Sequence, residues 1–323
     1  MSREGKNCII YGGGGFIGSH LCENLLNKGY NVTVFDKLNF SQKNLTDIID
    51  NIKIIEGDFN NEVDIERSLA DIDYVFHLVS STLPSNSNEN PVYDAETNLL
   101  SSLRLLDECR KNKMRKVVFL SSGGTVYGIP EEIPVKESHT INPIVSYGII
   151  KRTIEKYLYM YYKLYGLDYY VFRLSNPYGE RQNPLASQGA IAVFMYRIIN
   201  NLPIEIWGDG SITRDYIYIK DAVEVIAKSI ARKTDAKIFN VSTGKGYSLN
   251  DIIEIISSLS GKEAIVNYTE SRNIDVPVSI LDNTLAKEAF DWDPSTDITD
   301  GIRNTYEYMF HNYNNTPPTD VPF

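Results

Sequence analysis

Residues 8–21 read CIIYGGGGFIGSHL, and the four consecutive glycines raise the question of what approaches the backbone here. Gly13, Gly15 and Gly18 fit the spacing G-x-G-x-x-G. Gly12, Gly15 and Gly18 fit the spacing G-x-x-G-x-x-G equally well. Glycines at such spacings permit a tight turn and let a pyrophosphate lie against main-chain N–H groups. A flexible turn without a ligand is the alternative.

The sequence on either side of the glycines favours a binding turn. An apolar run over residues 7–11 precedes them, and an amphipathic segment over residues 19–28 follows and stops at Gly29. This order predicts a strand, a turn and a helix, so that the helix N-terminus offers unpaired N–H groups to an anion. We therefore expect a dinucleotide to bind at this turn.

The next apolar run, NVTVFD over residues 31–36, ends in an acidic residue. Asp36 lies 18 positions beyond Gly18, where a carboxylate can accept hydrogen bonds from both ribose hydroxyls of the adenosine and repel a 2′-phosphate. This position favours NAD over NADP. Lys37 beside it could pair with a phosphate, so NADP is the open alternative.

Composition sets outer limits on the function. The chain has 323 residues and a formal net charge of −10, which argues against nucleic acid as a partner. Cys8, Cys22 and Cys109 show no metal-ligand spacing and the four histidines are scattered, so we expect no metal and a reducing, cytoplasmic compartment. No apolar run approaches the roughly 18 residues of a membrane span, so no membrane association is expected.

Strands alternate with helical segments along the chain. The apolar runs expected to be strands are 7–11, 31–36, 52–58, 73–79, 116–122, 169–175 and 237–243. Apolar runs of this kind, separated by helices, predict a doubly wound α/β fold of the Rossmann type with about seven parallel strands. The alternation breaks twice, which predicts a smaller lobe. The expected division is a dinucleotide-binding domain over 1–175 and 216–243, a substrate-binding lobe over 176–215 and 244–310, and a disordered or extended tail over 311–323.

Residues that follow the strands are the candidate ligand contacts, because in open α/β sheets a ligand lies across the carboxyl ends of the strands. Asp58 follows the third strand, where it can hydrogen-bond the adenine amino group or, equally, cap a helix. Ser80 and Ser81 follow the fourth strand. They are small enough to let a cofactor lie over the sheet, and a solvated turn is the alternative.

A hydroxyl-rich stretch, SSGGTVYG over residues 121–128, follows the fifth strand, and SYGIIK comes after it. Tyr147 and Lys151 in SYGIIK are four residues apart, so a helix places them on one face, where the ammonium can lower the pKa of the phenol. The same Tyr–Lys spacing occurs at Tyr159 and Tyr216, so the spacing alone decides nothing. Only Tyr147 lies at a predicted helix start near the strand ends.

Six stretches resemble, in order and spacing, the extended short-chain dehydrogenase/reductase family and, within it, the nucleotide-sugar epimerases such as the UDP-galactose 4-epimerases. They are GGGGFIGSH, SSGGTVYG, SYGIIK, RLSNPYGERQ, WGDGSITRDYIYIKDA and the segment from ESRNIDVP to FDWDP, and together they span roughly residues 7–305. The resemblance implies tightly bound NAD, with Tyr147 as catalytic base and acid and Lys151 on the nicotinamide ribose. The cofactor contacts expected are Gly12, Gly15, Phe16, Ile17, Gly18, Asp36, Lys37, Asp58, Phe59, Leu78, Val79, Ser80, Asn98, Tyr147 and Lys151.

Two positions, Asn98 and Gly123, allow more than one interpretation. Asn98, at the opening of a helix predicted over residues 97–111, matches a family position near the cofactor, and an ordinary helix cap is the alternative. In the family the third residue of SSxxTVYG is Ser or Thr, which hydrogen-bonds the sugar 4-oxygen, whereas here it is Gly123. We expect Thr125 or Ser122 to supply that hydroxyl.

The same stretch separates reaction types. Related 4,6-dehydratases carry Asp-Glu at the positions of Gly124 and Thr125, and related uronic acid decarboxylases carry an acid at the position of Thr125. Without these acids, elimination or decarboxylation lacks an acid–base group. Epimerisation or simple 4-oxidoreduction remains.

The resemblance also implies substrate contacts. Arg214 and Arg272 match arginines that clamp the diphosphate through paired, charge-assisted hydrogen bonds. Asn176 matches a diphosphate or sugar contact and Asp275 a nucleoside or substrate-side position; surface arginines and a turn asparagine are the alternative. Ser279, seven residues after Arg272, stands where epimerases confined to glucose and galactose carry a bulky Tyr, which predicts that UDP-GlcNAc and UDP-GalNAc are accepted too.

The sequence therefore favours a UDP-glucose/UDP-galactose 4-epimerase that acts through a transient 4-keto sugar. A UDP-glucuronate 4-epimerase or another nucleotide-sugar oxidoreductase is the alternative among enzymes. A non-catalytic dinucleotide sensor is the alternative outside them, and the intact Tyr147 and Lys151 argue against it. By resemblance we expect a homodimer formed through the helices that begin near Asn98 and Tyr147.

Overall fold

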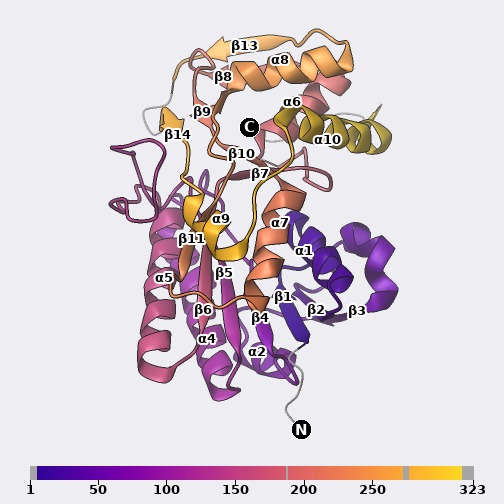
Figure 1. Ribbon diagram of the computed structural model, residues 1–323. Helices are drawn as coiled ribbons and strands as arrows, with labels where there is room; N and C mark the ends of the chain where they lie inside the picture. Colours follow the sequence, from indigo (N-terminus) through magenta and orange to yellow (C-terminus); the bar gives the residue numbers. More distant parts are fainter. Residues whose placement is uncertain (1–5, 187, 272–275, 315–323) are drawn as a thin grey trace.

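A sheet of seven parallel strands, in the order β11-β6-β5-β4-β1-β2-β3, forms the centre of the molecule. The computed structural model describes residues 6–186, 188–271 and 276–314 (Figure 1). The sheet strands are β1 (Asn7–Tyr11), β2 (Asn31–Asp36), β3 (Ile52–Glu56), β4 (Tyr74–His77), β5 (Lys116–Ser122), β6 (Tyr169–Leu174) and β11 (Ile238–Val241). Each predicted strand is present, so the Rossmann-type fold is confirmed.

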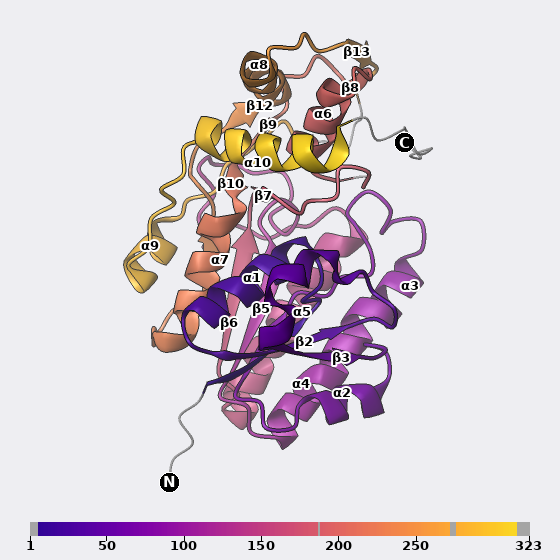
Figure 2. The same cartoon turned by 90° about the vertical axis from the view of Figure 1, so that its right-hand side faces the viewer.

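Helices cover both faces of this sheet. Figure 2 shows α7 and α9 on the left and α2 and α4 on the right. One face carries α1 (Phe16–Asn27), α7 (Ile219–Lys228) and α9 (Thr284–Phe290); the other carries α2 (Glu62–Ser68), α4 (Ser101–Lys111) and α5 (Ser146–Tyr165). Short 3-10 segments lie at Gln42–Asn51 and Ser229–Ala231.

Side chains alternate between the two faces along each strand, as the two-residue period of a strand requires. In β5, Val118 and Leu120 pack in the hydrophobic cluster that also contains residues of α1 and α7. Val117 and Phe119 pack in the cluster that contains residues of α4 and α5. Because both faces are buried, the strands are apolar almost throughout, which is why the sequence reveals them.

The smaller lobe lies above the carboxyl ends of the strands in Figure 1. Its helices are α6 (Ala190–Ile199), α8 (Leu249–Ser260) and α10 (Ile298–Tyr313). Short strands pair in and below it: β7 (Asn176–Tyr178) with β10 (Tyr216–Tyr218), β8 (Ile204–Trp207) with β13 (Val266–Thr269), and β9 (Thr213–Arg214) with β12 (Tyr247–Ser248) and β14 (Val278–Ser279).

Two segments differ from the predicted division. Helix α9 was expected in the smaller lobe, but it packs against β11 of the main sheet, where the rings of Phe290 and Phe239 lie 4.7 Å apart. Helix α10 continues to Tyr313, so the prediction of a disordered or extended tail is wrong for residues 311–313. The Tyr313 ring contacts Tyr196 of α6, which gives the last helical turn a packing partner.

The helix predicted over residues 97–111 starts earlier than expected. Helix α3 (Pro91–Asp94), a π-helical segment (Ala95–Leu100) and α4 follow one another without a break. Asn90 caps the first turn by accepting a hydrogen bond from the Tyr93 N–H at 3.0 Å. Asn98 therefore lies inside a continuous helix, and the alternative that it is a helix cap is wrong.

The aromatic cluster beneath α9 gives a stability prediction. Phe290→Ala is expected to lower the free energy of unfolding by about 3–5 kcal/mol, because the buried ring packs on Phe239, Phe172 and Tyr170 and its loss leaves a cavity. Urea unfolding followed by circular dichroism measures the change. Phe310→Ala, whose ring is 42% exposed on α10, is the control and should cost much less. Equal losses would contradict this account.

Candidate active site

A cavity of about 1200 Å³ lies at the carboxyl ends of the main strands and extends to the smaller lobe. The main sheet contributes residues that follow β4, β5 and β6, and the lobe contributes residues of α6, β8 and β9. This is the edge of the sheet at which the strand order predicts a ligand. The predicted site residues that line the cavity are Phe16, Ile17, Leu78, Ser80, Ser122, Thr125, Tyr147, Lys151, Asn176 and Arg214.

The glycine turn brings α1 close to β1. Gly12 has a φ of +83°, and a β-carbon on Gly18 would lie only 2.2 Å from the Gly12 carbonyl oxygen. Both positions therefore require glycine, as the G-x-x-G-x-x-G reading has it. Gly15 precedes the first residue of α1 and makes no side-chain cap, so the first N–H groups of the helix are available to an anion.

Asp36 lies beside this turn at the end of β2. Its carboxylate accepts hydrogen bonds from the Gly14 N–H at 2.9 Å and from the Lys37 N–H at 2.9 Å. These contacts fix an acceptor next to the glycine turn, where the ribose of a bound dinucleotide would need one. The turn and the carboxylate together fit the adenosine half of NAD.

Three other predicted cofactor residues near the glycine turn, Phe59, Val79 and Lys37, do not line the cavity. Phe59 packs against Tyr11, with ring centres 5.7 Å apart, and the Val79 side chain lies 3.5 Å from the position of a β-carbon on Gly12. Lys37 is exposed. Phe59 and Val79 therefore pack against the residues that form the turn.

Asp58 does not cap a helix. Its carboxylate accepts hydrogen bonds from the main-chain and side-chain N–H groups of Asn60, at 2.9 and 3.0 Å. The cap of α2 is Asn61, which accepts from the Val63 N–H at 2.9 Å. The capping alternative for Asp58 is wrong, and the carboxylate is exposed at the end of β3.

Helix α5 carries the predicted catalytic pair in its first two turns. Tyr147 is half-buried in the cavity wall, and Lys151 is buried one turn further on. The Lys151 Nζ lies 5.4 Å from the centre of the Tyr147 ring and donates a hydrogen bond to the Leu120 carbonyl at 3.0 Å. The structure thus brings the two side chains together at the end of β5.

The pKa values of Tyr147 and Lys151 differ from what the sequence led us to expect. Burial raises the pKa of Tyr147 to about 12, although a hydrogen bond with Ser80 acts in the lowering direction. Burial lowers the pKa of Lys151 to about 8, and the negative charges of Asp94 and Glu155 oppose that change. The expectation that Lys151 lowers the pKa of Tyr147 is not met, because burial dominates and the ammonium is directed at the Leu120 carbonyl.

Ser122 and Thr125, the two residues expected to replace the hydroxyl missing at Gly123, both line the cavity. The Thr125 Oγ1 is buried without a hydrogen-bond partner among the described residues, and Ser122 also lines the cavity. A β-carbon on Gly123 would instead meet the Leu281 side chain at 2.3 Å. A larger residue at position 123 would therefore require Leu281 to move, and neither Gly123 nor Leu281 lines the cavity.

Sequence reasoning missed the loop that holds the start of α5. Ser87 accepts a hydrogen bond from the Tyr147 N–H at 3.1 Å, and Asn88 accepts one from the Ser146 N–H at 2.9 Å. The buried carboxylate of Asp94 accepts from the Ser146 hydroxyl at 2.6 Å. Ser87 and Asn88 thus satisfy two main-chain N–H groups at the start of α5, and Asp94 fixes the Ser146 side chain.

Asn98 joins the same loop to the helix that follows it. Its amide donates to Asp94 at 2.8 Å, and its carbonyl accepts from the Ser81 N–H at 2.8 Å. Thr82 also donates to Asp94, at 2.7 Å. The spacing of Asp94 and Asn98, four residues apart on a helix, was the only signal in the sequence that could have found this cluster.

The predicted substrate residues fall into three groups. Arg214 and Asn176 line the cavity, and both side chains donate hydrogen bonds to main-chain carbonyls, at 2.6 and 3.0 Å. Ser279 pairs with Arg214 in the β14–β9 ladder and is buried, but it does not line the cavity. Arg272 and Asp275 lie outside the described residues.

The lobe side of the cavity offers two further polar atoms that sequence reasoning missed. Gln182 and Tyr196 line the cavity, and the Gln182 Oε1 and the Tyr196 hydroxyl are buried with no hydrogen-bond partner among the described residues. Buried polar atoms are normally paired, so these two are suited to a polar ligand.

The part of the chain that the structure describes shows neither a metal cluster nor a membrane-spanning helix. No group of three or more His, Cys, Asp or Glu side chains there is arranged to hold a metal ion. None of the described helices combines the length and the apolar character needed to cross a membrane. The three cysteines are buried and unpaired with one another.

Known proteins resemble this chain along most of its length. Residues 8–242 match the family described as NAD-dependent epimerase/dehydratase. The UDP-glucose 4-epimerase of Mycolicibacterium smegmatis is 33% identical, with 93% of this chain and 97% of that protein covered.

Two solved structures share the fold and the covered length. The UDP-glucose 4-epimerase of Thermotoga maritima with UDP-glucose has a TM-score of 0.90 and 35% identity, covering 94% of this chain and 99% of that one. The UDP-N-acetylglucosamine 4-epimerase of Methanobrevibacter ruminantium M1 in complex with UDP-N-acetylmuramic acid has a TM-score of 0.88 and 33% identity, covering 95% and 98%. With the glycine turn, Asp36 and the Tyr147–Lys151 pair in place, the chain belongs to the NAD-dependent epimerase/dehydratase family, and NAD is its cofactor.

Proposed function

We propose that this NAD-dependent nucleotide-sugar epimerase inverts C4 of a UDP-sugar, with UDP-glucose and UDP-galactose as its principal pair. The observation that carries the proposal is the grouping of Tyr147, Lys151 and Thr125 in the wall of one cavity. The similarity to UDP-sugar 4-epimerases over nearly the whole chain supports the same reaction.

Inversion at C4 without net oxidation needs one group that removes the proton of the 4-hydroxyl and later returns it. Bound NAD supplies the reversible hydride transfer that makes a transient 4-keto sugar. Tyr147 is the proton-transfer group in this proposal. Lys151, with a pKa of about 8, is mostly protonated at pH 7. In this proposal its ammonium would hold the nicotinamide ribose. Thr125 donates to the sugar 4-oxygen, and Ser122 is the alternative donor.

The far part of the cavity is proposed to hold the UDP moiety. Arg214 and Asn176 lie in its wall, where a cation and an amide suit a diphosphate. We propose Arg272 as the second diphosphate cation and Asp275 as a nucleoside-side contact.

The range of sugars is proposed to include UDP-GlcNAc and UDP-GalNAc. The similarity to a UDP-N-acetylglucosamine 4-epimerase supports this wider range. Ser279 supports it only indirectly, because it lies beside Arg214 behind the cavity wall.

Incubation with UDP-glucose, UDP-GlcNAc and UDP-glucuronate, with NMR analysis of the products, tests the proposed function. We expect UDP-galactose and UDP-GalNAc to form from the first two. Turnover of UDP-glucuronate alone would favour the uronic acid 4-epimerase. Bound NAD without turnover of any of the three would favour the dinucleotide sensor.

We further propose a cytoplasmic homodimer formed through α4 and α5. Exposed apolar side chains on the helical run that ends in α4 and on α5 support this surface, among them Leu100, Ile149 and Tyr159. A solution molar mass of twice 36.6 kDa is the expected result in light scattering.

Tyr147→Phe is expected to lower kcat by about 10²–10⁴-fold, because it removes the proton-transfer hydroxyl and no core volume. The rate of UDP-galactose formation and the thermal midpoint measure the effect and the fold. Tyr159→Phe is a matched control, since Tyr159 precedes Lys163 by the same four residues on the same helix but is 51% exposed. Near-normal activity of Tyr147→Phe would remove Tyr147 from this role.

Thr125→Val is expected to be milder, with kcat about tenfold lower, because it removes one hydrogen-bond donor while keeping the shape of the side chain. Since the Oγ1 has no partner in the described chain, the variant should not lose stability. Steady-state kinetics and thermal unfolding decide this together. A drop in stability without a drop in kcat would assign the hydroxyl a structural role.

Asp36→Ala is expected to weaken NAD retention and to shift the NAD/NADP preference toward NADP by about tenfold or more, because it removes the acceptor for the ribose hydroxyls and the charge that repels a 2′-phosphate. Cofactor exchange followed by activity with each dinucleotide measures the preference. Asp47→Ala, an exposed carboxylate on the nearby 3-10 segment, controls for the change in net charge. A wild-type protein that prefers NADP would contradict the assignment.

A further inference from the structure

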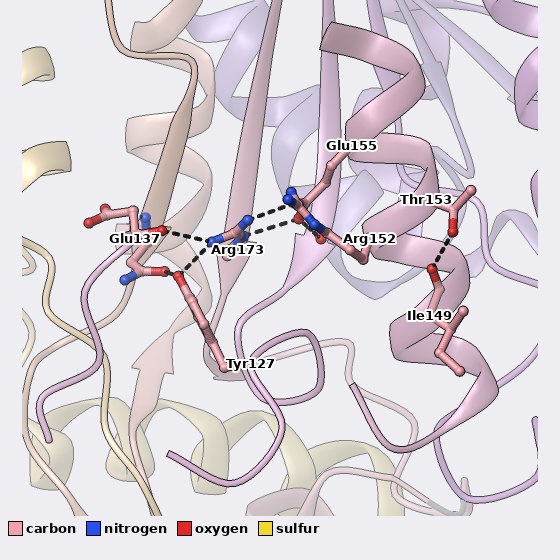
Figure 3. A network of polar contacts seen from close by, with 9 residues as sticks. Tyr127, Glu137, Ile149, Arg152, Thr153, Glu155 and Arg173 are labelled. Carbon is pink, nitrogen blue, oxygen red and sulfur yellow. Dashed lines mark hydrogen bonds and ion pairs between the residues drawn. The ribbon is translucent and has the colours of Figure 1, made fainter. Parts of the chain in front are cut away.

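A buried ion pair joins helix α5, which carries Tyr147 and Lys151, to strand β6. Arg173 of β6 is fully buried, and its Nε and Nη2 donate to the two carboxylate oxygens of Glu155 at 3.1 and 2.7 Å (Figure 3). Glu155 lies on α5, one turn after Lys151 and two turns after Tyr147. The two-pronged contact fixes the orientation of both groups, unlike a single point contact.

The same guanidinium reaches the loop that follows β5. Its Nη1 donates to the Tyr127 hydroxyl at 2.9 Å, and Tyr127 donates to Asn240 of β11 at 2.6 Å. Figure 3 shows Arg173 between Tyr127 and Glu155. Tyr127 follows Thr125 by two residues, so Arg173 is connected to both segments that supply the proposed catalytic groups.

Glu155 also connects to the strand beneath the site. Its carboxylate accepts a hydrogen bond from the Ser121 hydroxyl at 2.7 Å, and Ser121 is the neighbour of Ser122 at the end of β5. Arg152 contributes a further contact to Glu155 at 2.8 Å from the outer side of the helix. Four charge-assisted hydrogen bonds thus end on one carboxylate.

We propose that Arg173, together with Glu155, is a positioning residue that holds α5 and the loop of residues 122–127 in register across the cavity. It touches neither the reacting atoms nor the cofactor site. It sets the relative placement of Tyr147 and Thr125, which come from different segments and must meet at one sugar carbon. This inference rests on the proposed epimerase function.

Stability alone is a weak explanation for this pair. Removing two charges from water costs several kcal/mol, and well-packed apolar residues often replace a buried ion pair without loss. A second buried cation on the sheet gives a comparison: Lys116, at the start of β5, lies 3.5 Å from Asp168 and far from the cavity wall. Of these two pairs, it is the Arg173 pair that joins the segments carrying the proposed catalytic groups.

The charge of Glu155 adds a second effect at the site. It favours the protonated form of Lys151, in the same direction as Asp94 and against the burial of the lysine. Loss of Arg173 would leave the Glu155 carboxylate held by Ser121 and Arg152 alone among the described residues.

The test compares Arg173→Met, Arg173→Met/Glu155→Leu and the control Lys116→Met, with kcat expressed per bound NAD so that unfolded protein does not count. Arg173→Met is expected to lower kcat by about 100-fold with KM changed less than about threefold, since misplacement of reacting groups by about 1 Å can have that effect. The double variant is expected to regain thermal stability but not kcat. Lys116→Met should lose stability and keep kcat.

Recovery of kcat in the double variant, or an equal loss of kcat in Lys116→Met, would show that Arg173 acts through stability alone and would overturn the proposal. If Arg173→Met does not fold, Arg173→Lys replaces it, because lysine keeps the charge and loses the two-pronged contact. Arg173→Lys is expected to lower kcat by about tenfold while KM again changes little. An unchanged kcat in Arg173→Lys would also overturn the proposal.

Hydrogen exchange separates this inference from the proposed function. Arg173→Met should accelerate amide exchange in residues 122–127 and 146–151 more than Lys116→Met does. Equal exchange in the two variants would overturn the positioning role, whatever the activity. A wild-type chain that turns over no UDP-sugar would contradict the proposed function, and the exchange comparison would then decide the positioning role alone.

Discussion

The carbonyl oxygen of Gly12 lies 2.2 Å from the point at which a β-carbon on residue 18 would be placed. Helix α1 can approach β1 only because that side chain is absent. The approach sets the depth of α1 in the fold, and with it the contact between α1 and α7 and the place of Phe16 and Ile17 in the cavity wall. It also leaves the first N–H groups of the helix at the turn, which is the requirement for holding an anion there.

The sequence was sufficient for the main sheet because burial on both faces makes each strand apolar throughout, and because helices between such strands allow a parallel order only. It was also sufficient to place Tyr147, Lys151 and Thr125 in one region, since the ends of parallel strands converge on one edge. Position 123 illustrates the limit. A comparison of sequences shows only that Gly123 lacks the hydroxyl of the family. The structure shows in addition that a β-carbon at this position would meet the Leu281 side chain.

The contacts that the sequence did not reveal are polar and long-range. Asp94 meets Ser146 across 52 residues, Ser87 meets the Tyr147 N–H across 60, and Tyr127 meets Asn240 across 113. Nothing local distinguishes such an aspartate or serine from one in a solvated loop, because its partner is chosen by the tertiary fold. The pKa values follow the same rule: burial, which local sequence does not encode, outweighs the charge of a neighbour four residues away.

In the π-helical segment Ala95–Leu100, the number of residues matters more than the identity of most of them. A π turn accommodates one residue more than an α turn, so the helix before it is rotated by about 100° relative to the helix after it. That rotation lets Asp94 face Ser146 and Thr82 while α4 keeps its own buried stripe. Deleting one residue here would restore a regular α-helix and turn Asp94 away from α5. Substitutions at exposed positions of this segment, such as Glu96, should therefore be tolerated where a change of length is not.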